Sequence, residues 1–377
     1  MNAPIRILQV FNSMNRGGAE SMIMNLYRQI DKKKIQFDFL VHTTNKGAFD
    51  DEIRELGGNL YYIPRFQGYN YLSYKQAWNN FFNQHNEYKV IHGHIGSCAA
   101  IYLHMANKRG MFTIAHSHST KKSIKKIKTP QEIMFPIFSY PTRFIADYFF
   151  GCSMLAGRYR YGDEIVNSDR FAIINNAVKT QDYIFNKDTR IKYRNDFNLK
   201  DQFVIIHVGR FDAPKNQSYL IDIFKEYQSI DKEAILMLVG DGPLKDEMEE
   251  KVNKHNLQKN VIFTGIRDDV ANLLKAGDVF VFPSIYEGLP VTLIEAQATG
   301  LKCIVSDTVT KEVKVTDLVE FVGLNEPIEK WINKIRDSSN SYSRTDQSNE
   351  LAASGYDIKE TANFLEEFYI NGHNKCI

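Results

Sequence analysis

The chain has 377 residues, enough for two domains of ordinary size that each bury a hydrophobic core. Lys and Arg number 47 and Asp and Glu 45, and this near balance argues against a protein that binds nucleic acid through bulk charge. The four cysteines are scattered and form no CxxC pair, which predicts buried or incidental thiols in a reducing compartment and no disulfide framework.

The N-terminal apolar run Ile5–Phe11 suits a first buried strand and is too short for the core of a signal peptide. No run of about 18 consecutive apolar residues occurs, so we expect no membrane-spanning helix. Both observations predict a cytoplasmic protein.

Apolar runs of strand length alternate with longer segments of helical period. In the first half the runs are Ile5–Phe11, Phe37–Val41, Leu60–Ile63, Val90–His94, Phe112–His118 and Phe144–Cys152. In the second half they are Phe203–Val208, Ile235–Val239, Val261–Thr264, Val279–Pro283 and Cys303–Ser306. This alternation predicts an α/β fold of two doubly wound, Rossmann-like domains that bind ligands outside the carboxyl ends of their strands.

The polar segment Lys179–Gln202 is the best candidate for the domain boundary. It predicts an N-terminal domain of residues 1–178 and a C-terminal domain of residues 179–356. A second polar stretch, from Arg336 to Ser348, precedes a last helix expected near Ile358–Ile370.

Two carboxylates, Glu287 and Glu295, stand eight residues apart after the predicted strand Val279–Pro283. A helix that begins after Pro290 would carry Glu295 on its inner face and leave Glu287 in the loop before it. Carboxylates at this spacing are usually a solvated helix face, but Glu295 lies among apolar and small residues. Gly288 would allow a ligand to approach the backbone, and the first helix amides would form an anion site.

Two cations follow the first strand of the second half. Arg210 comes directly after Gly209, and Lys215 stands five residues later, where the next helix should begin. Together they could neutralise a nucleotide diphosphate, although a surface Arg and Lys after a strand is an equally simple interpretation. Gly240, at the end of the following strand, could wall the same pocket or belong to a plain strand-turn-helix link.

The run YEGLPVTLIEAQATG, with its E-x7-E spacing, resembles the signature of the retaining nucleotide-sugar transferases of glycosyltransferase family 4. Gly209 to Lys215 is similar to the G-R-x4-K pattern of that family, except that Asn216 follows where many members have Gly. The GGAE turn, in which Gly17 and Gly18 precede a helix, is similar to the turn after the first strand of the family. By itself such a turn is more often a simple strand-to-helix connection.

The resemblance implies the two-domain GT-B fold, whose domains face each other across a cleft and whose C-terminal helix, here about 357–377, packs back on the first domain. It also implies donor-binding roles for a set of residues: Gly17, Gly18, Arg210, Lys215, Gly240, Ile266, Arg267, Glu287, Gly288, Leu289, Pro290, Val291, Thr292 and Glu295. In this assignment Glu295 binds the ribose hydroxyls and Glu287 the hydroxyls of the donor sugar. Ile266 and Arg267 face the nucleobase.

Four histidines form two H-x-H pairs, each at the end of a predicted strand, in the order His92, His94, His116 and His118. Imidazole is a good ligand for zinc, but no DxH, HxxxD or HExxH arrangement completes a site, so we expect no metal. By resemblance, His118 is the catalytic histidine beside the donor sugar, and His116 replaces it if the register slips by two. His94, Ser97 and His116 are expected on the acceptor side.

A basic run at residues 121–128 is followed by an apolar patch at residues 134–138. Lysines beside apolar anchors suit an anionic bilayer surface, although a merely solvated charge run is the alternative. The lysines are Lys121, Lys122, Lys125, Lys126 and Lys128. They predict peripheral association with the inner face of the cell membrane, which fits a lipid-linked acceptor.

The resemblance, together with these residues, implies a metal-independent glycosyltransferase without a cofactor. It would move a hexose or N-acetylhexosamine from a nucleotide-sugar, with UDP favoured by the resemblance, to a lipid-linked saccharide in polysaccharide biosynthesis. Retention at the anomeric carbon is implied by the resemblance, with His118, Glu287, Arg210 and Lys215 as the catalytic set. The alternatives are a nucleotide-sugar epimerase of the same architecture and a non-catalytic sugar-binding protein.

Overall fold

The computed structural model describes residues 3–118, 139–287, 289–339 and 343–376. The chain divides into two compact units. The N-terminal unit comprises Met1–Ala177 with Ile358–Ile377, and the C-terminal unit comprises Val178–Asp357. None of the helices in the described ranges combines the length and the apolarity needed to cross a membrane.

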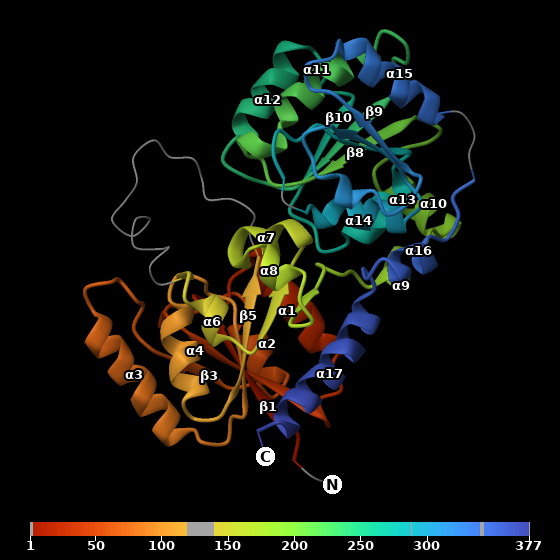
Figure 1. Cartoon of the computed structure of the whole chain (residues 1–377). Coiled ribbons are helices and arrows are strands. Elements are labelled where there is room, and N and C mark those ends of the chain that lie inside the picture. Colours follow the sequence, from red (N-terminus) through yellow and green to blue (C-terminus); the bar gives the residue numbers. More distant parts are fainter. Residues whose placement is uncertain (1–2, 119–138, 288, 340–342, 377) are drawn as a thin grey trace. The chain divides into compact units, whose positions relative to one another are not determined.

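The N-terminal unit is built on a seven-stranded parallel sheet with the order β3-β2-β1-β4-β5-β6-β7 (Figure 1). Its strands are β1 Ile5–Phe11, β2 Ile35–Val41, β3 Leu60–Tyr62, β4 Val90–Gly93, β5 Phe112–Ser117, β6 Tyr148–Gly151 and β7 Phe171–Ile173. Its helices are α1 Gly18–Gln29, α2 Asp50–Glu55, α3 Tyr71–Gln84, α4 Ala99–Asn107, α6 Thr142–Ile145, α7 Met154–Tyr161, α8 Asp163–Val166 and α17 Ile358–Asn374.

Both faces of this sheet are covered by helices. Ile7 and Phe11 on β1 pack into one core with α1 and α17, whereas Leu8 and Val10 on the same strand pack into a second core with α3 and α4. Because each strand is buried on both faces, its sequence is apolar almost throughout and not alternating. The last helix, α17, therefore belongs to the N-terminal unit, where it contacts α1, β1 and β4.

The C-terminal unit is built on a six-stranded parallel sheet with the order β10-β9-β8-β11-β12-β13 (Figure 1). Its strands are β8 Val204–Val208, β9 Ile235–Val239, β10 Val261–Gly265, β11 Val279–Phe282, β12 Lys302–Ser306 and β13 Val319–Val322. Its α-helices are α9 Thr180–Tyr183, α10 Lys187–Asp196, α11 Gln217–Tyr227, α12 Lys245–Lys254, α13 Val270–Ala276, α14 Val291–Ala298, α15 Ile328–Ser339 and α16 Ser348–Ala353, with 3₁₀ turns η1 Ala213–Lys215 and η2 Lys311–Val313.

Helices α11, α12 and α15 cover one face of the second sheet, and α10, α13 and α14 cover the other (Figure 1). In α11 the buried residues Leu220, Ile223, Phe224 and Tyr227 recur at helical spacing, so one stripe of that helix enters the core. In each sheet the strand order reverses once, between β1 and β4 and between β8 and β11. Ligands of doubly wound sheets bind at the carboxyl ends of strands beside such a reversal.

Three expectations about the strands were wrong. The run Phe144–Cys152 begins as helix α6, and only its second half, β6, is a strand. The side chain of Phe144 is 76% exposed, so its apolar character reflects a surface position. The short strands β7 and β13 were missed, because each is only partly buried and carries a weak apolar pattern.

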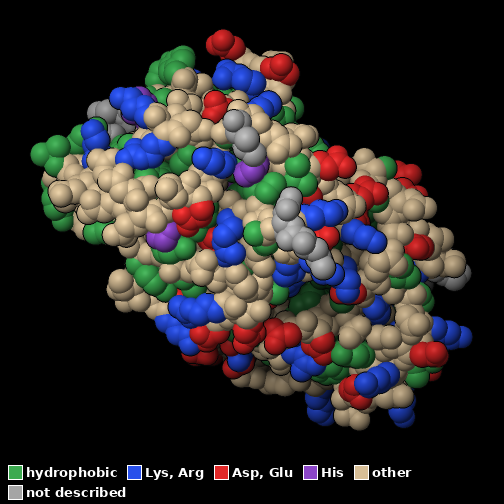
Figure 2. All heavy atoms as spheres, turned by 90° about the horizontal axis from the view of Figure 1, so that it is seen from below, with side chains coloured by type: hydrophobic (Ala, Val, Ile, Leu, Met, Phe, Trp, Pro, Cys, Tyr) green, Lys and Arg blue, Asp and Glu red, His purple; other side chains and the backbone are tan. Residues whose placement is uncertain are grey.

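Charged side chains of both signs are interspersed over the face shown in Figure 2. This distribution agrees with the formal net charge of +2. The lysines of the predicted membrane-binding run, residues 121–128, and the apolar patch at residues 134–138 lie outside the described residues.

Candidate active site

In the C-terminal unit a hollow of about 540 Å³ opens where β8 and β9 end. Three loops line it, with Val208, Gly209, Arg210, Val239, Gly240, Asp241, Gly242, Ile266, Arg267 and Val270. The loop after β9 needs glycine at position 240, because its φ is +135° and a Cβ there would lie 2.2 Å from the carbonyl oxygen of Gly209. Of the predicted donor-binding residues, the structure brings Arg210, Gly240, Ile266 and Arg267 together here.

Arg210 is exposed at the carboxyl end of β8, and its guanidinium has no partner among the described residues. Arg267 differs, since its guanidinium forms a two-point contact with Asp269 at 2.8 and 2.6 Å. Ile266, next to it, is 72% exposed. An unpaired cation beside an exposed apolar side chain is suited to a ligand that carries both a phosphate and a flat apolar group.

Lys215 and Glu287 form an ion pair with 2.7 Å between Nζ and Oε1. The two groups are not aligned as a hydrogen bond, so Oε1 of Glu287 accepts none from the described residues. The Lys215 ammonium also lies 4.8 Å from the ring centroid of Phe282, at the end of β11. Both side chains are largely buried, with 17% and 14% of their surfaces exposed, so the pair is shielded from screening by salt.

The backbone conformation of Asn216 explains how asparagine can stand where many members of the family have glycine. Its φ is +56°, in the left-handed region that asparagine tolerates better than other side chains. Its Nδ2 donates to the carbonyl oxygen of Pro283 at 3.0 Å, and the amide of Ile285 donates to that of Pro214 at 2.8 Å. These bonds join the loop that carries Lys215 to the loop that carries Glu287.

Glu295 lies on α14 and accepts a hydrogen bond from the hydroxyl of Tyr183, with 2.7 Å between the oxygens. Burial raises the pKa of Glu295, and the Tyr183 hydroxyl partly offsets that effect. Burial and the nearby carboxylate raise the pKa of Tyr183, so this phenol remains a donor. Tyr183 was missed because it lies in the polar segment interpreted as a domain boundary. No local signal in the sequence connects it to Glu295.

The N-terminus of α14 follows the Glu287 loop directly. Gly288 lies outside the described residues, Leu289 is partly buried, and Pro290 precedes the first helical residue, Val291. The first amides of a helix have no partner within it and attract anions. On the same helix, Oγ1 of Thr292 is buried without a hydrogen-bond partner among the described residues.

Further orphaned atoms lie on the segments that follow β8 and β11. Oδ1 of Asp212 and Oγ of Ser284 are both buried without a partner in the described part of the chain. A buried polar atom without a partner costs about 1–3 kcal/mol, so proteins rarely leave several in one place. Their concentration at the strand-order reversal of this sheet indicates a site for a polar ligand.

In the N-terminal unit, Gly17 and Gly18 stand at the start of α1, after β1. Gly17 has an ordinary extended φ of −98°, so the turn does not require glycine for its conformation. A Cβ at Gly17 would meet only the flexible carboxylate of Glu20, and a Cβ at Gly18 would meet no described atom within 4 Å. Open space at Gly18 is compatible with the predicted close approach of a ligand.

The four histidines come together at the ends of β4 and β5. His92 and His116 share a hydrogen bond with 3.2 Å between Nε2 and Nδ1, and His94 and His118 share one with 2.7 Å between Nδ1 and Nε2. The two pairs stack, with ring centroids 4.3 Å apart for His92 and His94 and 4.0 Å apart for His116 and His118. Ser97 is exposed in the loop after β4.

All four imidazoles are neutral near pH 7, because burial lowers the pKa of each. The pKa of His118 falls to about 3, and the pKa values of the other three lie well below the ordinary 6.5. His92 and His116 are buried, while His94 and His118 keep some exposed surface. His118 can therefore reach a ligand as a neutral imidazole.

Three histidines of this cluster are close enough to share a metal ion, because nitrogens of His92, His94 and His116 lie within 4.8 Å of one another. The rings of His92 and His116 are nearly parallel, at 8°, and their facing nitrogens share one proton. A metal would need lone pairs from nitrogens that are used in these hydrogen bonds. The absence of a metal stays a prediction.

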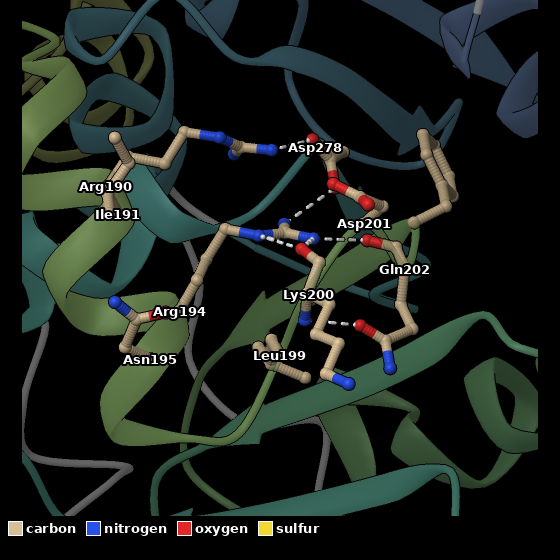
Figure 3. Close-up of a pocket in the computed structure, with 10 residues that line it drawn as sticks. Arg190, Ile191, Arg194, Asn195, Leu199, Lys200, Asp201, Gln202 and Asp278 are labelled. Carbon is tan, nitrogen blue, oxygen red and sulfur yellow. Dashed lines mark hydrogen bonds and ion pairs between the residues drawn. The ribbon is translucent and has the colours of Figure 1, made fainter.

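Figure 3 shows a different cavity of the C-terminal unit, of about 420 Å³, near the amino ends of β8 and β11. Arg194 donates to the carbonyl oxygens of Lys200 and Gln202 and contacts Asp278 at 3.2 Å, and Arg190 contacts the same carboxylate at 2.6 Å. These charged groups satisfy one another and attach α10 to the sheet. The cavity therefore has a structural role and lies at the end of the sheet away from Arg210.

Comparison with known proteins agrees with this geometry. Residues 189–350 match the family model described as glycosyl transferases group 1. Over 373 residues the chain is 34% identical to EpsF of Bacillus subtilis, which is named as a glycosyltransferase, and the match covers 97% of this chain and 96% of that protein. This chain belongs to the group 1 glycosyl transferases.

Other proteins are similar to parts of the sequence or to the fold. A UDP-Gal:α-D-GlcNAc-diphosphoundecaprenol α-1,3-galactosyltransferase of Escherichia coli is 31% identical over 46% of each chain. CapH of Staphylococcus aureus, a capsular polysaccharide biosynthesis glycosyltransferase, is 26% identical over 82% of each chain. The crystal structure of Anabaena HepE in complex with UDP has a TM-score of 0.78 at 17% identity and covers 97% of this chain and 100% of that chain. The predicted GT-B fold of two Rossmann-like domains is confirmed.

Proposed function

We propose that this glycosyltransferase transfers a hexose or N-acetylhexosamine from UDP-sugar to a lipid-linked saccharide in polysaccharide biosynthesis, with retention at the anomeric carbon and without a metal ion. The observation that carries the proposal is the site at the ends of β8 and β11. There the Arg210 guanidinium and several buried polar atoms lack partners within the described part of the chain, and the Lys215–Glu287 pair accompanies them. The UDP complex of HepE and the printed donor and acceptor of the E. coli relative support the choice of substrates.

Each group of the site has a defined task in this proposal. Arg210 and Lys215 hold the diphosphate and stabilise the negative charge that grows on it as the sugar–phosphate bond breaks. Lys215 also pairs with Glu287, so its ammonium would be shared between that carboxylate and a phosphate of the donor. The amides at the start of α14 add further donors.

The two glutamates bind hydroxyls. The Glu295 carboxylate, oriented by Tyr183, accepts from the ribose hydroxyls, and Glu287 accepts from the donor sugar. His118 orients the sugar for attack on the same face from which the diphosphate departs. A covalent route would require a carboxylate on the opposite face, and the sequence identifies none with that role.

The donor assignment is tested by titration of the whole chain with UDP, GDP and ADP. Only a nucleotide that prefers the native fold raises its melting temperature, and UDP is expected to do so most. Arg210→Met and the double variant Lys215→Met/Glu287→Gln should each weaken UDP binding roughly 10- to 100-fold, the loss expected for charge-assisted hydrogen bonds worth about 1.5–3 kcal/mol. The matched control is Lys225→Met, which removes an exposed lysine of the same unit.

The reaction itself is tested with UDP-sugars and a saccharide carried on diphosphoundecaprenol. Transfer with an α-linked product from an α-linked donor, unchanged by EDTA, is the expected result. Turnover of the donor without acceptor would favour an epimerase. Nucleotide binding that survives the variants, with no transfer by any form, would favour a non-catalytic sugar-binding protein.

Peripheral membrane association is part of the proposal. It is supported by the lysine run at residues 121–128 and by the diphosphoundecaprenol named for the E. coli relative. Cosedimentation with vesicles that contain anionic lipid should decrease when the five lysines are replaced by Gln. It should also decrease when the vesicles contain only neutral lipid, because each lysine near an anionic surface contributes about 1 kcal/mol.

A further inference from the structure

The histidine cluster of the N-terminal unit is joined to two buried polar side chains that the sequence did not single out. Gln9, on β1, is 0% exposed, and its Oε1 lies 2.9 Å from Nε2 of His94. Its Nε2 donates to the hydroxyl of Tyr369, on α17, at 3.3 Å. The Tyr369 hydroxyl lies 2.7 Å from Nδ1 of His92. One hydrogen-bonded chain therefore runs outward from the Gln9 amide in two directions.

The first direction ends at His118. A neutral imidazole has one N–H donor and one lone-pair acceptor. Because the amide oxygen of Gln9 can only accept, His94 carries its proton on Nε2, and its Nδ1 accepts from Nε2–H of His118 at 2.7 Å. His118 is then left with a lone pair on Nδ1, so it accepts a hydrogen bond from a ligand.

The second direction ends at His116. The Tyr369 hydroxyl accepts from the Gln9 amide and donates its own proton to Nδ1 of His92. His92 then carries a proton on Nε2 and donates it to Nδ1 of His116 at 3.2 Å. His116 is left with an N–H on Nε2, a buried atom without a partner among the described residues, so this end offers a donor.

We propose that Gln9 and Tyr369 are positioning residues that hold all four imidazoles in the Nε2–H tautomer and thereby give the cluster one acceptor, His118 Nδ1, and one donor, His116 Nε2–H. The inference rests on the proposed function, in which His118 lies beside the donor sugar. His118 keeps some exposed surface, so its lone pair can meet a sugar hydroxyl, whereas the His116 N–H is buried inside the cluster. His118 thus accepts from a hydroxyl and does not donate to one.

The opposite character of the two ends does not depend on which way the amide points. If the Gln9 amide turned over, every proton in the chain would shift, all four imidazoles would become Nδ1–H, and the two ends would exchange roles. An amide has one donating and one accepting side, so it always gives the two directions opposite polarity. The low pKa values of the buried rings supply the neutral state that this requires.

The test reads tautomers directly, from the ring ¹⁵N shifts of the full chain labelled with ¹⁵N-histidine at pH 7. In the wild type, His92, His94, His116 and His118 should all be in the Nε2–H form. His207 is an internal reference, because its Nδ1 donates to the carbonyl oxygen of Val281 at 2.9 Å and it should be Nδ1–H in every sample.

Gln9→Glu replaces the amide by a group that accepts on both sides. His94 and His118 should keep the Nε2–H form, while His92 and His116 should invert to Nδ1–H, because Tyr369 would now donate to the carboxylate. Tyr369→Phe, a smaller change, should leave His92 and His116 as a mixture of both forms. UDP affinity should be unchanged in both variants, and kcat/KM for transfer should fall roughly 2- to 10-fold, as expected for one lost hydrogen bond.

Mixed tautomers among the four wild-type rings would overturn the proposal, and so would retention of the wild-type forms of His92 and His116 in both variants. The tautomers are measured without a ligand. If the rings behave as expected and the protein neither binds UDP nor transfers a sugar, the proposed function fails and the tautomer relay stands.

Discussion

Lowering the pH from 7 to 5 should destabilise the N-terminal unit far more than the C-terminal unit. Burial lowers the pKa of five imidazoles in the N-terminal unit: His42 to about 4, His118 to about 3, and His92, His94 and His116 well below 6.5. In the C-terminal unit the corresponding group is His207, with a pKa of about 4. The units therefore differ in how many neutral imidazoles they must keep buried.

The sign and size follow from proton linkage. An unfolded chain binds a proton at each histidine below about pH 6.5, whereas the folded chain does so only near the lowered pKa. Stability is therefore fully present above pH 6.5 and is lost as the pH falls toward 4. For a folded pKa of about 4, the loss at pH 5 is about 2 kcal/mol per imidazole. Five such groups give at most about 10 kcal/mol, comparable with the whole stability of a typical domain.

The two tryptophans separate the two units. Trp78 lies in the N-terminal unit and Trp331 in the C-terminal unit, and both are fully buried. Trp331→Phe leaves fluorescence that reports on the N-terminal unit, and Trp78→Phe leaves fluorescence that reports on the C-terminal unit. Urea unfolding is followed at pH 7 and pH 5. The free energy of unfolding reported by Trp78 should fall by several kcal/mol, whereas that reported by Trp331 should fall by about 2 kcal/mol. Equal losses of unfolding free energy in the two units, or no loss in the N-terminal unit, would refute the reasoning.

Three substitutions test other contacts. Arg194→Met removes one partner of the largely buried Asp278 carboxylate and should lower the free energy of unfolding in urea by about 3 kcal/mol. An unchanged urea midpoint would contradict the structural role of the cavity in Figure 3. Gly240→Ala should lower the melting temperature more than Gly265→Ala, because both have positive φ but only the first Cβ meets a backbone oxygen, and the reverse order would contradict that geometry. Tyr183→Phe should weaken UDP binding roughly 10-fold in calorimetry and raise the pKa of Glu295 further, while unaltered binding would separate Glu295 from the nucleotide.

Much of the fold could be predicted from the sequence, because strands buried on both faces of a parallel sheet are recognisable as short apolar runs. Ile5–Phe11 and Ile235–Val239 were located to the residue. Apolar runs do not mark strands where apolar residues are exposed, as at Phe144, or where a strand is short and half-buried, as in β7 and β13. In those places hydrophobicity and burial do not coincide.

The candidate site divides in the same way. The segments that bear Arg210, Lys215, Glu287 and Glu295 could be singled out from the sequence because each couples a strand end to a glycine turn or a helix start, which are local patterns. The Lys215–Glu287 pair, the Tyr183–Glu295 hydrogen bond and the left-handed Asn216 could not be predicted, since each depends on which loops the sheet brings together.

The sequence by itself determined which residue types stand at the strand ends, because chain order and local spacing place a glycine, a cation or a histidine at the end of a strand. Only the tertiary structure decided their partners. Gln9 and Tyr369 are separated by 360 residues, yet they meet because α17 returns to pack on β1 and β4. The proton positions in the histidine cluster depend on this contact between Gln9 and Tyr369, which no local sequence pattern predicts.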